Sequence, residues 1–375
     1  MWRDMPVKKS SDRWQRADEE VRKNLPAGVK HVCTLRGPTT IVRIAWSPDG
    51  QMLASLSSDG SIHVWDTASR HEVRASINHP KGFSAFAWSP DSKTIALSAR
   101  DERIQFWSIT SGELADGPLQ SPEPVLCVAW DPSGRQLACS SCGENEPRHT
   151  AGGLWILDIL SQRFDKLPFA MTGVEIKWSP DGRRIANGGY WGDGVLDLVD
   201  VTKSGSSTGQ INARYGGWSN CFDLDWASDG SIIVSGSQDG TVKVWDPSSG
   251  KLMRSLEGHT SQLVSSVSLS SRCQLLASVA VDETLRIWRC DKWEQSAVIP
   301  WLVGEGCSLK QMIDFSPTSS TLAVAEKREI HILELDLAGL LGEGGVPSAH
   351  YVNAKVVLVG DTGVGKTGLS LEAIS

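Results

Sequence analysis

The chain has 375 residues, a hydrophobic content of 40% and a formal net charge of −7 at pH 7. This length suits one large domain or two ordinary ones. Charges of both signs are interspersed and form no basic stripe, which argues against nucleic acid as a direct ligand. No apolar run approaches the ~20 residues that a membrane span needs, and the charged N-terminus does not resemble a signal peptide. We therefore expect a cytoplasmic protein without a membrane partner.

The eight cysteines are spread along the chain and most lie in or beside predicted strands. Cys139 and Cys142 have the CxxC spacing, but residues three apart in a strand point to opposite faces of the sheet. A shared metal or redox site is therefore disfavoured there. We expect free core thiols in a reducing compartment.

Residues 1–29 precede the first regular pattern. Ser11 and Asp12 can cap a short helix that continues to about Leu25, before the breakers Pro26 and Gly28. Such a helix is marginal on its own. We expect it to pack on the domain that follows, and the alternative is a frayed terminus.

The segment Val42–Asp66 reads as three short strands joined by two tight turns. The first turn, Ser47-Pro48-Asp49-Gly50, combines a residue with preset φ, a side chain that caps its own backbone and a residue that accepts positive φ. The second turn, Ser58-Asp59-Gly60, has the same chemistry. The unit ends on the pair Trp65-Asp66.

This unit recurs along the chain at intervals of 42 to 48 residues. Its first-strand tryptophan has the counterparts Trp46, Trp88, Trp130, Trp178, Trp226, Leu269 and Phe315. Its third-strand residue has the counterparts Trp65, Trp107, Trp155, Leu198, Trp245, Trp288 and Ile332. A period near 40–45 residues with a closing Trp-Asp is typical of a propeller blade. On these seven copies the chain resembles the WD-repeat β-propellers over residues 30–336.

The strand His31–Leu35 has no hairpin partner before it. In WD-repeat proteins the sequence repeat is offset from the blade, so the resemblance implies that this strand pairs with Ile330–Leu335 of the last blade. Such pairing closes the ring and removes an open sheet edge.

Several connections carry aromatic or basic side chains, and alternation of strand direction should bring those connections to one face of the disc. The residues concerned are Phe83, Arg148, His149, Tyr190, Trp191, Trp218 and Trp301. Exposed aromatic residues and Arg are typical anchors for protein partners. The hypothesis is a partner-binding face, and the alternative is that these rings fill seams between blades.

Other polar residues resemble the internal hydrogen-bond network of the WD-repeat family. Blade six has all four members, His259, Ser278, Asp282 and Trp288. Blade five has Ser235, Asp239 and Trp245, and blade one has Ser55, Asp59 and Trp65. A Ser-His-Asp hydrolase site is the alternative for blade six. The structural interpretation is favoured because a buried Trp N–H needs a partner and the spacing recurs where no His is present.

The pattern changes after Asp336. Residues 337–350 read as a linker, and Ala354–Val359 reads as a buried strand. The strand leads into Gly360–Thr367, which has the GxxxxGK[ST] form in the strand–loop–helix context of a phosphate loop. Backbone N–H groups would wrap a phosphate, Lys366 would reach the β- and γ-phosphates, and Thr367 would hold Mg²⁺. The predicted nucleotide-binding residues are Gly360, Asp361, Thr362, Gly363, Val364, Gly365, Lys366, Thr367 and Gly368.

The sequence of this loop resembles the first motif of Ras-like small GTPases over residues 351–375. This resemblance implies GTP and Mg²⁺ as cofactors of a complete protein. No DxxG or NKxD motif follows it in the sequence. We therefore expect residues 351–375 to be a truncated domain start that neither binds nucleotide well nor hydrolyses it.

The expected fold is an all-β, seven-bladed WD-repeat propeller closed by an N-terminal strand. A short N-terminal helix precedes it and the start of an α/β P-loop domain follows it. The main hypothesis is a scaffold that binds other proteins and is joined to a GTP switch. The alternatives are a pure WD-repeat scaffold with a non-functional phosphate loop, and a propeller enzyme, for which the sequence shows no catalytic motif.

Overall fold

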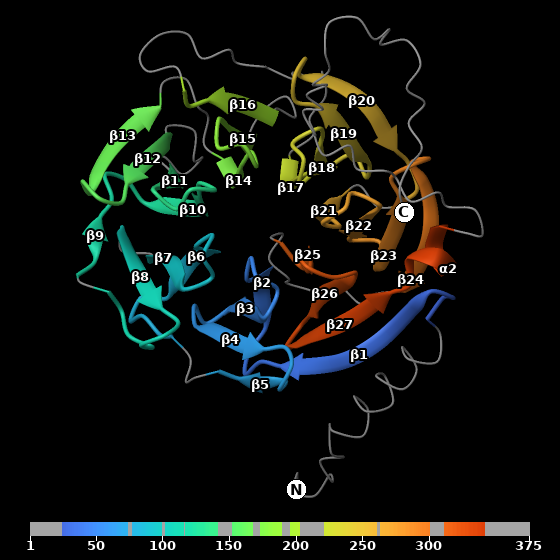
Figure 1. Cartoon of the computed structure of the whole chain (residues 1–375), viewed down its shortest axis with the longest axis horizontal. Helices are drawn as coiled ribbons and strands as arrows, with labels where there is room; N and C mark the ends of the chain where they lie inside the picture. Colours follow the sequence, from blue (N-terminus) through green and yellow to red (C-terminus); the bar gives the residue numbers. More distant parts are fainter. Residues whose placement is uncertain are drawn as a thin grey trace, which may run out of the picture. The chain divides into compact units, whose positions relative to one another are not determined.

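The computed structural model describes residues 25–73, 77–99, 102–115, 117–141, 152–167, 173–189, 196–202, 221–260, 263–300 and 311–341. Within these residues, seven antiparallel sheets surround a common axis (Figure 1). The innermost strand of each sheet contacts the innermost strands of both neighbouring sheets, so the sheets close into a ring. The predicted seven-bladed all-β propeller is confirmed.

The strands of the first four blades follow one another in chain order from the axis outward. Blade one has β2 (Ile41–Trp46), β3 (Met52–Ser57), β4 (Ile62–Asp66) and β5 (His71–Glu72). Blade two has β6 (Phe83–Trp88), β7 (Thr94–Ala99), β8 (Arg103–Ser108) and β9 (Leu119–Gln120). Blade three has β10 (Val125–Trp130), β11 (Gln136–Ser141), β12 (Leu154–Asp158) and β13 (Arg163–Leu167). The described part of blade four has β14 (Gly173–Trp178), β15 (Arg184–Gly189) and β16 (Leu196–Asp200).

The last three blades contain the strands that bring the chain back to its start. Blade five has β17 (Cys221–Trp226), β18 (Ile233–Ser237), β19 (Val242–Asp246) and β20 (Lys251–Leu256). Blade six has β21 (Val264–Leu269), β22 (Leu275–Ala280), β23 (Thr284–Arg289) and β24 (Glu294–Pro300). Blade seven has β25 (Ile313–Phe315), β26 (Thr321–Glu326), β27 (Glu329–Leu335) and, from the other end of the chain, β1 (Val29–Arg36).

The ring is closed by β1, which lies antiparallel to β27 as the outer strand of blade seven. The pairing runs from Val29 opposite Leu335 to Arg36 opposite Glu329. The predicted closure by His31–Leu35 is therefore confirmed. Because β1 and β27 are about three hundred residues apart in sequence, the last blade forms only when both ends of the domain are present.

The turn after each inner strand has the conformation that its residues predict. In blade one the Gly50 N–H donates to the Ser47 carbonyl over 2.8 Å, and the Ser47 hydroxyl donates to Asp49 over 2.6 Å. Gly50 has φ +71°, and a Cβ added there would lie 2.2 Å from the Thr318 hydroxyl oxygen of blade seven. Glycine is therefore required both by the backbone and by the neighbouring blade.

The core is divided among the seams rather than gathered at one centre. Seven clusters of buried apolar side chains each join two adjacent blades. For example, Leu56 and Ile62 of blade one pack with Phe83 and Phe86 of blade two. Strands that are buried on both faces explain why the sequence shows apolar runs as well as alternation.

The strand register corrects three of the predicted third-strand positions. In blade one Leu53 pairs with both Trp46 and Trp65. By the same register the counterparts of Trp65 in blades three, four and seven are Leu157, Val199 and Leu333. The predicted Trp155, Leu198 and Ile332 are wrong because residue type alone does not show which residue pairs with the second strand. At the start of the predicted linker, Leu337–Leu341 forms the short helix α2.

Two predicted parts fall outside the described residues: the helix before Leu25 and the phosphate loop in residues 351–375. Among the described residues, no helix is both long and apolar enough to cross a membrane.

Removing the buried end of the closing strand should loosen the whole ring. Leu35 is 3% exposed and packs in the seam between blades seven and one. We expect Leu35→Ala to lower the free energy of unfolding by about 2–4 kcal/mol, because it leaves a cavity in that seam. Urea denaturation measures the loss. Val32→Ala, on an exposed side chain of the same strand, is the matched control and should change stability by less than about 0.5 kcal/mol. Equal losses in both variants would contradict the assignment.

Candidate functional site

The residues predicted for a partner-binding face fall into two groups. Arg148, His149, Tyr190, Trp191, Trp218 and Trp301 lie outside the described residues. Phe83 is described, and it is 1% exposed in the seam between blades one and two, with the His79 ring 5.5 Å away between centroids. For Phe83 the seam-filling alternative therefore holds, because the residue begins an inner strand and points between the sheets.

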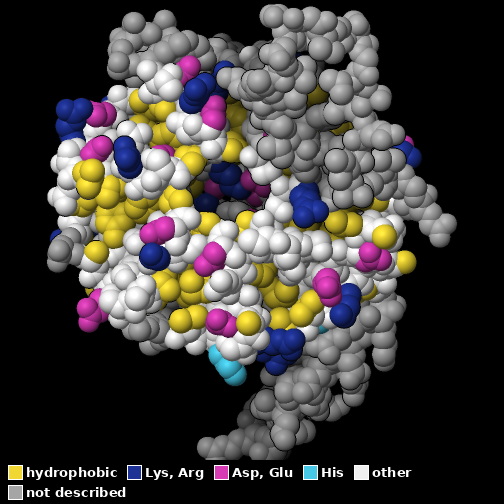
Figure 2. Space-filling model, viewed as in Figure 1, with side chains coloured by type: hydrophobic (Ala, Val, Ile, Leu, Met, Phe, Trp, Pro, Cys, Tyr) yellow, Lys and Arg dark blue, Asp and Glu magenta, His cyan; other side chains and the backbone are white. Residues whose placement is uncertain are grey.

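The inner strands that form the wall of the central channel share a β-bulge. In six blades the inner strand has a β-bulge just before the residue that stands three positions ahead of its tryptophan or equivalent. A bulge re-aims the side chain that follows it. The residues at this position are Arg43, Ala85, Cys127, Glu175, Asp223 and Ser266. Figure 2 shows basic and acidic side chains inside the central hollow.

A buried ion pair spans the channel. The Arg43 guanidinium of blade one donates to both oxygens of Glu175 in blade four, over 2.7 and 3.1 Å. Both residues are buried. Burial alone would lower the pKa of Arg43, but its interactions with Glu175 and Cys127 together outweigh burial and hold the pKa above its ordinary value. Removing one partner of such a pair leaves an uncompensated buried charge, so the two residues act as a unit that fills the centre of the ring.

A second group of charges consists of Asp223 at the same position and, two residues nearer the inner-strand turns, Lys177, Asp225 and Asp314. The Lys177 ammonium of blade four is 3.0 Å from the Asp225 carboxylate of blade five. The Asp314 carboxylate of blade seven accepts the backbone N–H of Trp46 over 2.8 Å. In blade five, Asp223 accepts the Ser266 hydroxyl over 2.7 Å and the Val267 N–H over 3.0 Å. Carboxylates outnumber cations here. Burial raises the pKa of both Asp223 and Asp314 to about 7, against the opposing effect of Lys177.

The first-strand tryptophans link neighbouring blades through their indole N–H groups. Each donates to the backbone carbonyl of the preceding blade, one residue ahead of that blade's own tryptophan or equivalent. The pairs are Trp46 to Asp314, Trp88 to Ala45, Trp130 to Ala87, Trp178 to Ala129 and Trp226 to Lys177, over 3.0 to 3.3 Å. A buried indole N–H needs such a partner.

Blades six and seven lack that tryptophan, and side chains replace its hydrogen bond. The Leu269 N–H donates to Asp225 of blade five over 2.8 Å. The Phe315 N–H donates to the Ser268 hydroxyl of blade six over 3.0 Å. All seven seams among the described residues are thus crossed by a hydrogen bond at the same level.

The four network residues of blade six form one chain of hydrogen bonds. Trp288 donates its indole N–H to the Ser278 hydroxyl over 2.8 Å, and Ser278 lies 2.8 Å from His259 Nε2. His259 Nδ1 lies 3.1 Å from Asp282. Burial lowers the pKa of His259 despite the Asp282 carboxylate. The neutral ring then donates from Nδ1 to Asp282 and accepts from Ser278 at Nε2.

These four hydrogen-bonded residues cannot work as a hydrolase triad. Ser278 is fully buried, and one lone pair of its hydroxyl is already occupied by the Trp288 N–H. A nucleophile must reach a substrate carbon, which this serine cannot do. The structural interpretation is therefore the one that the geometry supports.

Blades one and five contain only parts of the network. Trp65 donates to Ser55 over 3.2 Å, and Trp245 donates to Ser235 over 2.9 Å. The turn aspartates have other partners. Asp59 accepts the Ser61 hydroxyl over 2.6 Å. Asp239 accepts from the Thr241 hydroxyl over 2.6 Å and from the Lys243 ammonium group.

Blade three has a cluster that the sequence analysis missed. Trp155 donates to Ser141 and to Glu123, each over 3.2 Å, and the Lys166 ammonium lies 3.1 Å from Glu123 and 4.9 Å from the centroid of the Trp155 ring. Trp155 stands at the position that His63 occupies in blade one, opposite the second strand. The cluster flanks the β11–β12 connection that contains Arg148 and His149. Its only sequence signal is an indole two residues ahead of the usual position.

The described residues contain no group of three or more His, Cys, Asp or Glu side chains placed to hold a metal ion. None of the six described cysteines forms a disulfide. Burial raises the pKa of the Cys221 thiol to about 12 and also raises that of Cys139, which makes both poor nucleophiles.

The comparisons agree with this architecture. The family model described as WD domain, G-beta repeat, matches residues 29–66, 72–108, 117–144, 209–246 and 250–289. The β-propeller domain of Cps50 (Swd1) from Myceliophteria thermophila has a similar structure, with a TM-score of 0.64 and 16% sequence identity, covering 83% of this chain and all of that one. That likeness concerns the fold alone. The chain is a WD-repeat seven-bladed β-propeller.

Three curated relatives match parts of this chain. Protein HIR1 of Mycosarcoma maydis is 28% identical over 165 residues, which cover 40% of this chain and 16% of that protein. The chromatin assembly factor 1 subunit FAS2 homolog of Oryza sativa is 30% identical over 113 residues, covering 30% and 22%. COMPASS component SWD3 of Saccharomyces cerevisiae is 26% identical over 114 residues, covering 30% and 34%. The chain thus matches about a third or less of the length of each relative.

The complete network of blade six should stabilise more than the partial network of blade five. Ser278→Ala leaves both Trp288 and His259 without their shared hydroxyl, whereas Ser235→Ala affects only Trp245. We expect Ser278→Ala to cost about 2–3 kcal/mol and Ser235→Ala about 1 kcal/mol, because each buried group left unsatisfied is penalised separately. Denaturant titration of the two variants checks this order, and the reverse order would refute the account.

The raised pKa of Asp223 predicts a pH dependence of stability. Between its ordinary value and about 7, the folded chain holds a proton that the unfolded chain releases. The stabilisation is complete below about pH 4 and is lost as pH rises through about 7. We expect the wild type to lose on the order of 1–3 kcal/mol between about pH 5 and pH 8 from this group. Asp223→Asn, whose amide oxygen can still accept from Ser266 and Val267, should reduce that loss.

Thermal unfolding across this pH range measures the difference. Asp165→Asn, on the exposed strand β13, is the control and should follow the wild type. A wild-type pH profile in Asp223→Asn would show that Asp223 is ionised throughout.

Proposed function

We propose that this protein is an interaction scaffold: a WD-repeat propeller that binds other proteins and has no catalytic role in the described part of its ring. The observation that carries the proposal is a propeller whose centre is filled by its own Arg43–Glu175 pair, with both residues buried. The pair crosses the channel where a ligand of a propeller centre would lie, so we place recognition on the exposed faces.

The relatives suggest which kind of assembly the scaffold joins. The names of two of them refer to chromatin assembly factor 1 and to COMPASS. We propose a similar role for this chain as a subunit of a multiprotein complex, which makes a nuclear location as reasonable as the cytoplasm. Free thiols suit either compartment.

The binding surface that we propose is the face formed by the β11–β12 and β15–β16 connections and by the segments that lead into β17 and β25. It contains Arg148, His149, Tyr190, Trp191, Trp218 and Trp301. Supporting it, the Glu123–Lys166–Trp155 cluster fixes both ends of the β11–β12 connection: Ser141 and Gly153 exchange hydrogen bonds over 3.0 and 3.1 Å. A rigid base reduces the entropy cost of ordering a binding loop.

Loss of two aromatic side chains should separate the scaffold from its partners. We expect proteins that co-purify stoichiometrically with the full chain to fall at least tenfold with the double substitution Trp191→Ala and Trp218→Ala, because aromatic anchors dominate binding energy. Quantitative mass spectrometry after cross-linking measures this. Leu160→Ala, at an exposed position of the β12–β13 turn on the opposite face, is the control. If the wild type, the double variant and the control recover their partners equally, this face is not the binding surface.

A nucleotide switch is the second candidate, supported by the strand Ala354–Val359 followed by Gly360–Gly368. The comparisons favour the scaffold over the switch. For this chain we expect mant-GTP with Mg²⁺ to give the same weak signal with the wild type and with Lys366→Ala, because the sequence has no NKxD motif to bind guanine. Fluorescence titration is the measurement. Saturable binding that Lys366→Ala abolishes would instead support the switch.

A further inference from the structure

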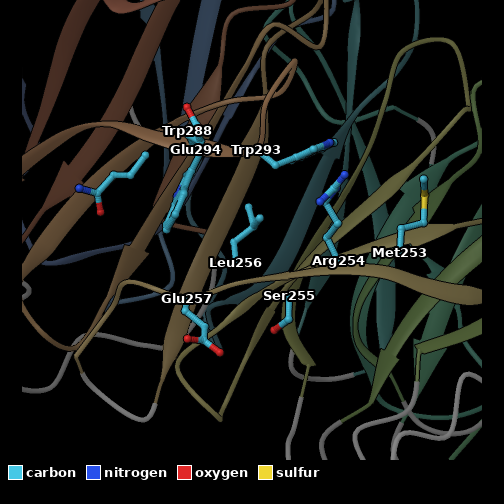
Figure 3. Close-up of a pocket in the computed structure, with 9 residues that line it drawn as sticks. Met253, Arg254, Ser255, Leu256, Glu257, Trp288, Trp293 and Glu294 are labelled. Carbon is cyan, nitrogen blue, oxygen red and sulfur yellow. The ribbon is translucent and has the colours of Figure 1, made fainter.

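A groove lies on the outer rim between blades five and six (Figure 3). It has a volume of about 470 Å³, which is within the range of ligand-binding clefts. One wall is the outer strand β20 with the next residue, Met253–Glu257, and the other is formed by Trp288, Trp293, Glu294 and Gln295 of blade six.

The floor of the groove is apolar and the rim is charged. Leu256 and Trp288 are buried and belong to the core cluster of this seam, and Trp293 packs against the same cluster. Figure 3 shows Leu256 among these side chains, with Arg254 and Met253 along β20. Met253 is 55% exposed. An apolar floor with an exposed thioether suits a bulky apolar side chain, since Met adapts to irregular shapes.

The wall of the groove formed by β20 contains a bulge. The register of β20 against β19 shifts at Met253. As a result Leu252 packs in the seam between blades four and five, whereas Leu256 packs in the seam between blades five and six. A bulge bends its strand and changes the face to which the next side chains point, and β24 of blade six has a bulge at the equivalent place.

Trp293 occupies an unfavourable backbone conformation at the edge of the groove. It has φ +59°, at the fourth residue of the turn between β23 and β24, and its N–H donates to the Arg289 carbonyl over 2.8 Å. The same turn position has positive φ in four other blades, where the residues are Arg70, Gly112, Gln162 and Gly250. A bulky side chain is rarely found in this region, and such outliers cluster at binding sites. Among these five blades an indole stands only at this position in blade six, where it packs against the core cluster of the seam.

The rim charges indicate what would lie against this indole. Glu257 and Glu294 are exposed, and neither forms an ion pair among the described residues, whereas Arg254 is the single cation of the lining. The rim therefore has one negative charge in excess. A basic group beside the apolar side chain of a ligand would complement it, while an acidic one would be repelled.

We infer that this groove binds a linear segment of a partner protein through one bulky apolar side chain, placed between β20 and Trp293, next to a Lys or Arg that pairs with Glu257 and Glu294. This inference deepens the proposed scaffold function by assigning it a second surface. It uses none of the residues of the proposed face, so failure at one surface leaves the other testable.

The test uses a phage library of random 12-residue peptides selected on the full chain, with the strongest sequence resynthesised for titration. We expect that peptide to contain an aromatic or large aliphatic residue adjacent to Lys or Arg. On titration it should shift the ¹³C-methyl resonance of Met253, assigned by Met253→Leu. The double charge reversal Glu257→Lys and Glu294→Lys should weaken the Kd at least tenfold.

Trp293→Gly separates binding from folding. Glycine is the residue that blades two and five have at this turn position, so the variant should fold, while its affinity for the peptide falls at least tenfold. Glu113→Lys, at an exposed position on the rim of blade two, is the control and should keep the wild-type Kd.

Three results would overturn the inference. One is a selection that yields no peptide, or only peptides without a basic residue. Another is a Kd that both groove variants leave within twofold of the wild type. The third is sedimentation that shows a homodimer disrupted by the groove variants, because the occupant would then be a second copy of the chain.

Discussion

Hydrogen bonds between the inner strands hold the seven blades in one ring. At five seams the indole N–H of a tryptophan donates to a carbonyl of the preceding blade, and at the other two a side chain of Asp225 or Ser268 binds the equivalent backbone N–H. Each sheet alone buries only part of its apolar surface, and the core exists only in the seams. The seam is therefore the unit of stability, and closure by β1 completes the last blade.

The same inner strands also decide what the centre of the molecule can do. The bulge in each of six inner strands turns one side chain toward the axis, and in blades one and four these are Arg43 and Glu175. Burying such a pair has a large desolvation cost, which the bidentate geometry offsets. The excess of carboxylates beside it is accommodated because Asp223 and Asp314 bind protons more tightly than usual. The centre is thus a structural element with an electrostatic cost.

Departures from the repeat are where this molecule differs from an idealised propeller. Trp155 replaces the residue that faces the second strand and gathers Glu123 and Lys166 around it. Trp293 replaces a glycine or flexible polar residue in a turn with positive φ. Both side chains pack against the core cluster of a seam. Both place an indole near the surface of the ring, one beside the connection that contains Arg148 and His149 and the other at the rim groove, and this agrees with a scaffold that has more than one contact surface.

The sequence by itself determined the number of blades, the positions of their turns and the closing strand. Each of these follows from a local signal: a recurring Trp, a Ser-Pro-Asp-Gly turn or an unpaired apolar strand. The resemblance to the WD-repeat family added the Ser278–His259 network and the pairing of the closing strand with the last blade. The sequence could not identify Leu157, Val199 and Leu333 as third-strand residues, since register depends on pairing with the second strand rather than on residue type. The predicted exposure of Phe83 was wrong because exposure depends on contacts with the neighbouring blade. Only the tertiary structure decided that Arg43 meets Glu175 and that Met253 lies across a groove from Trp293, because each contact joins residues of different blades whose distance is set by ring closure.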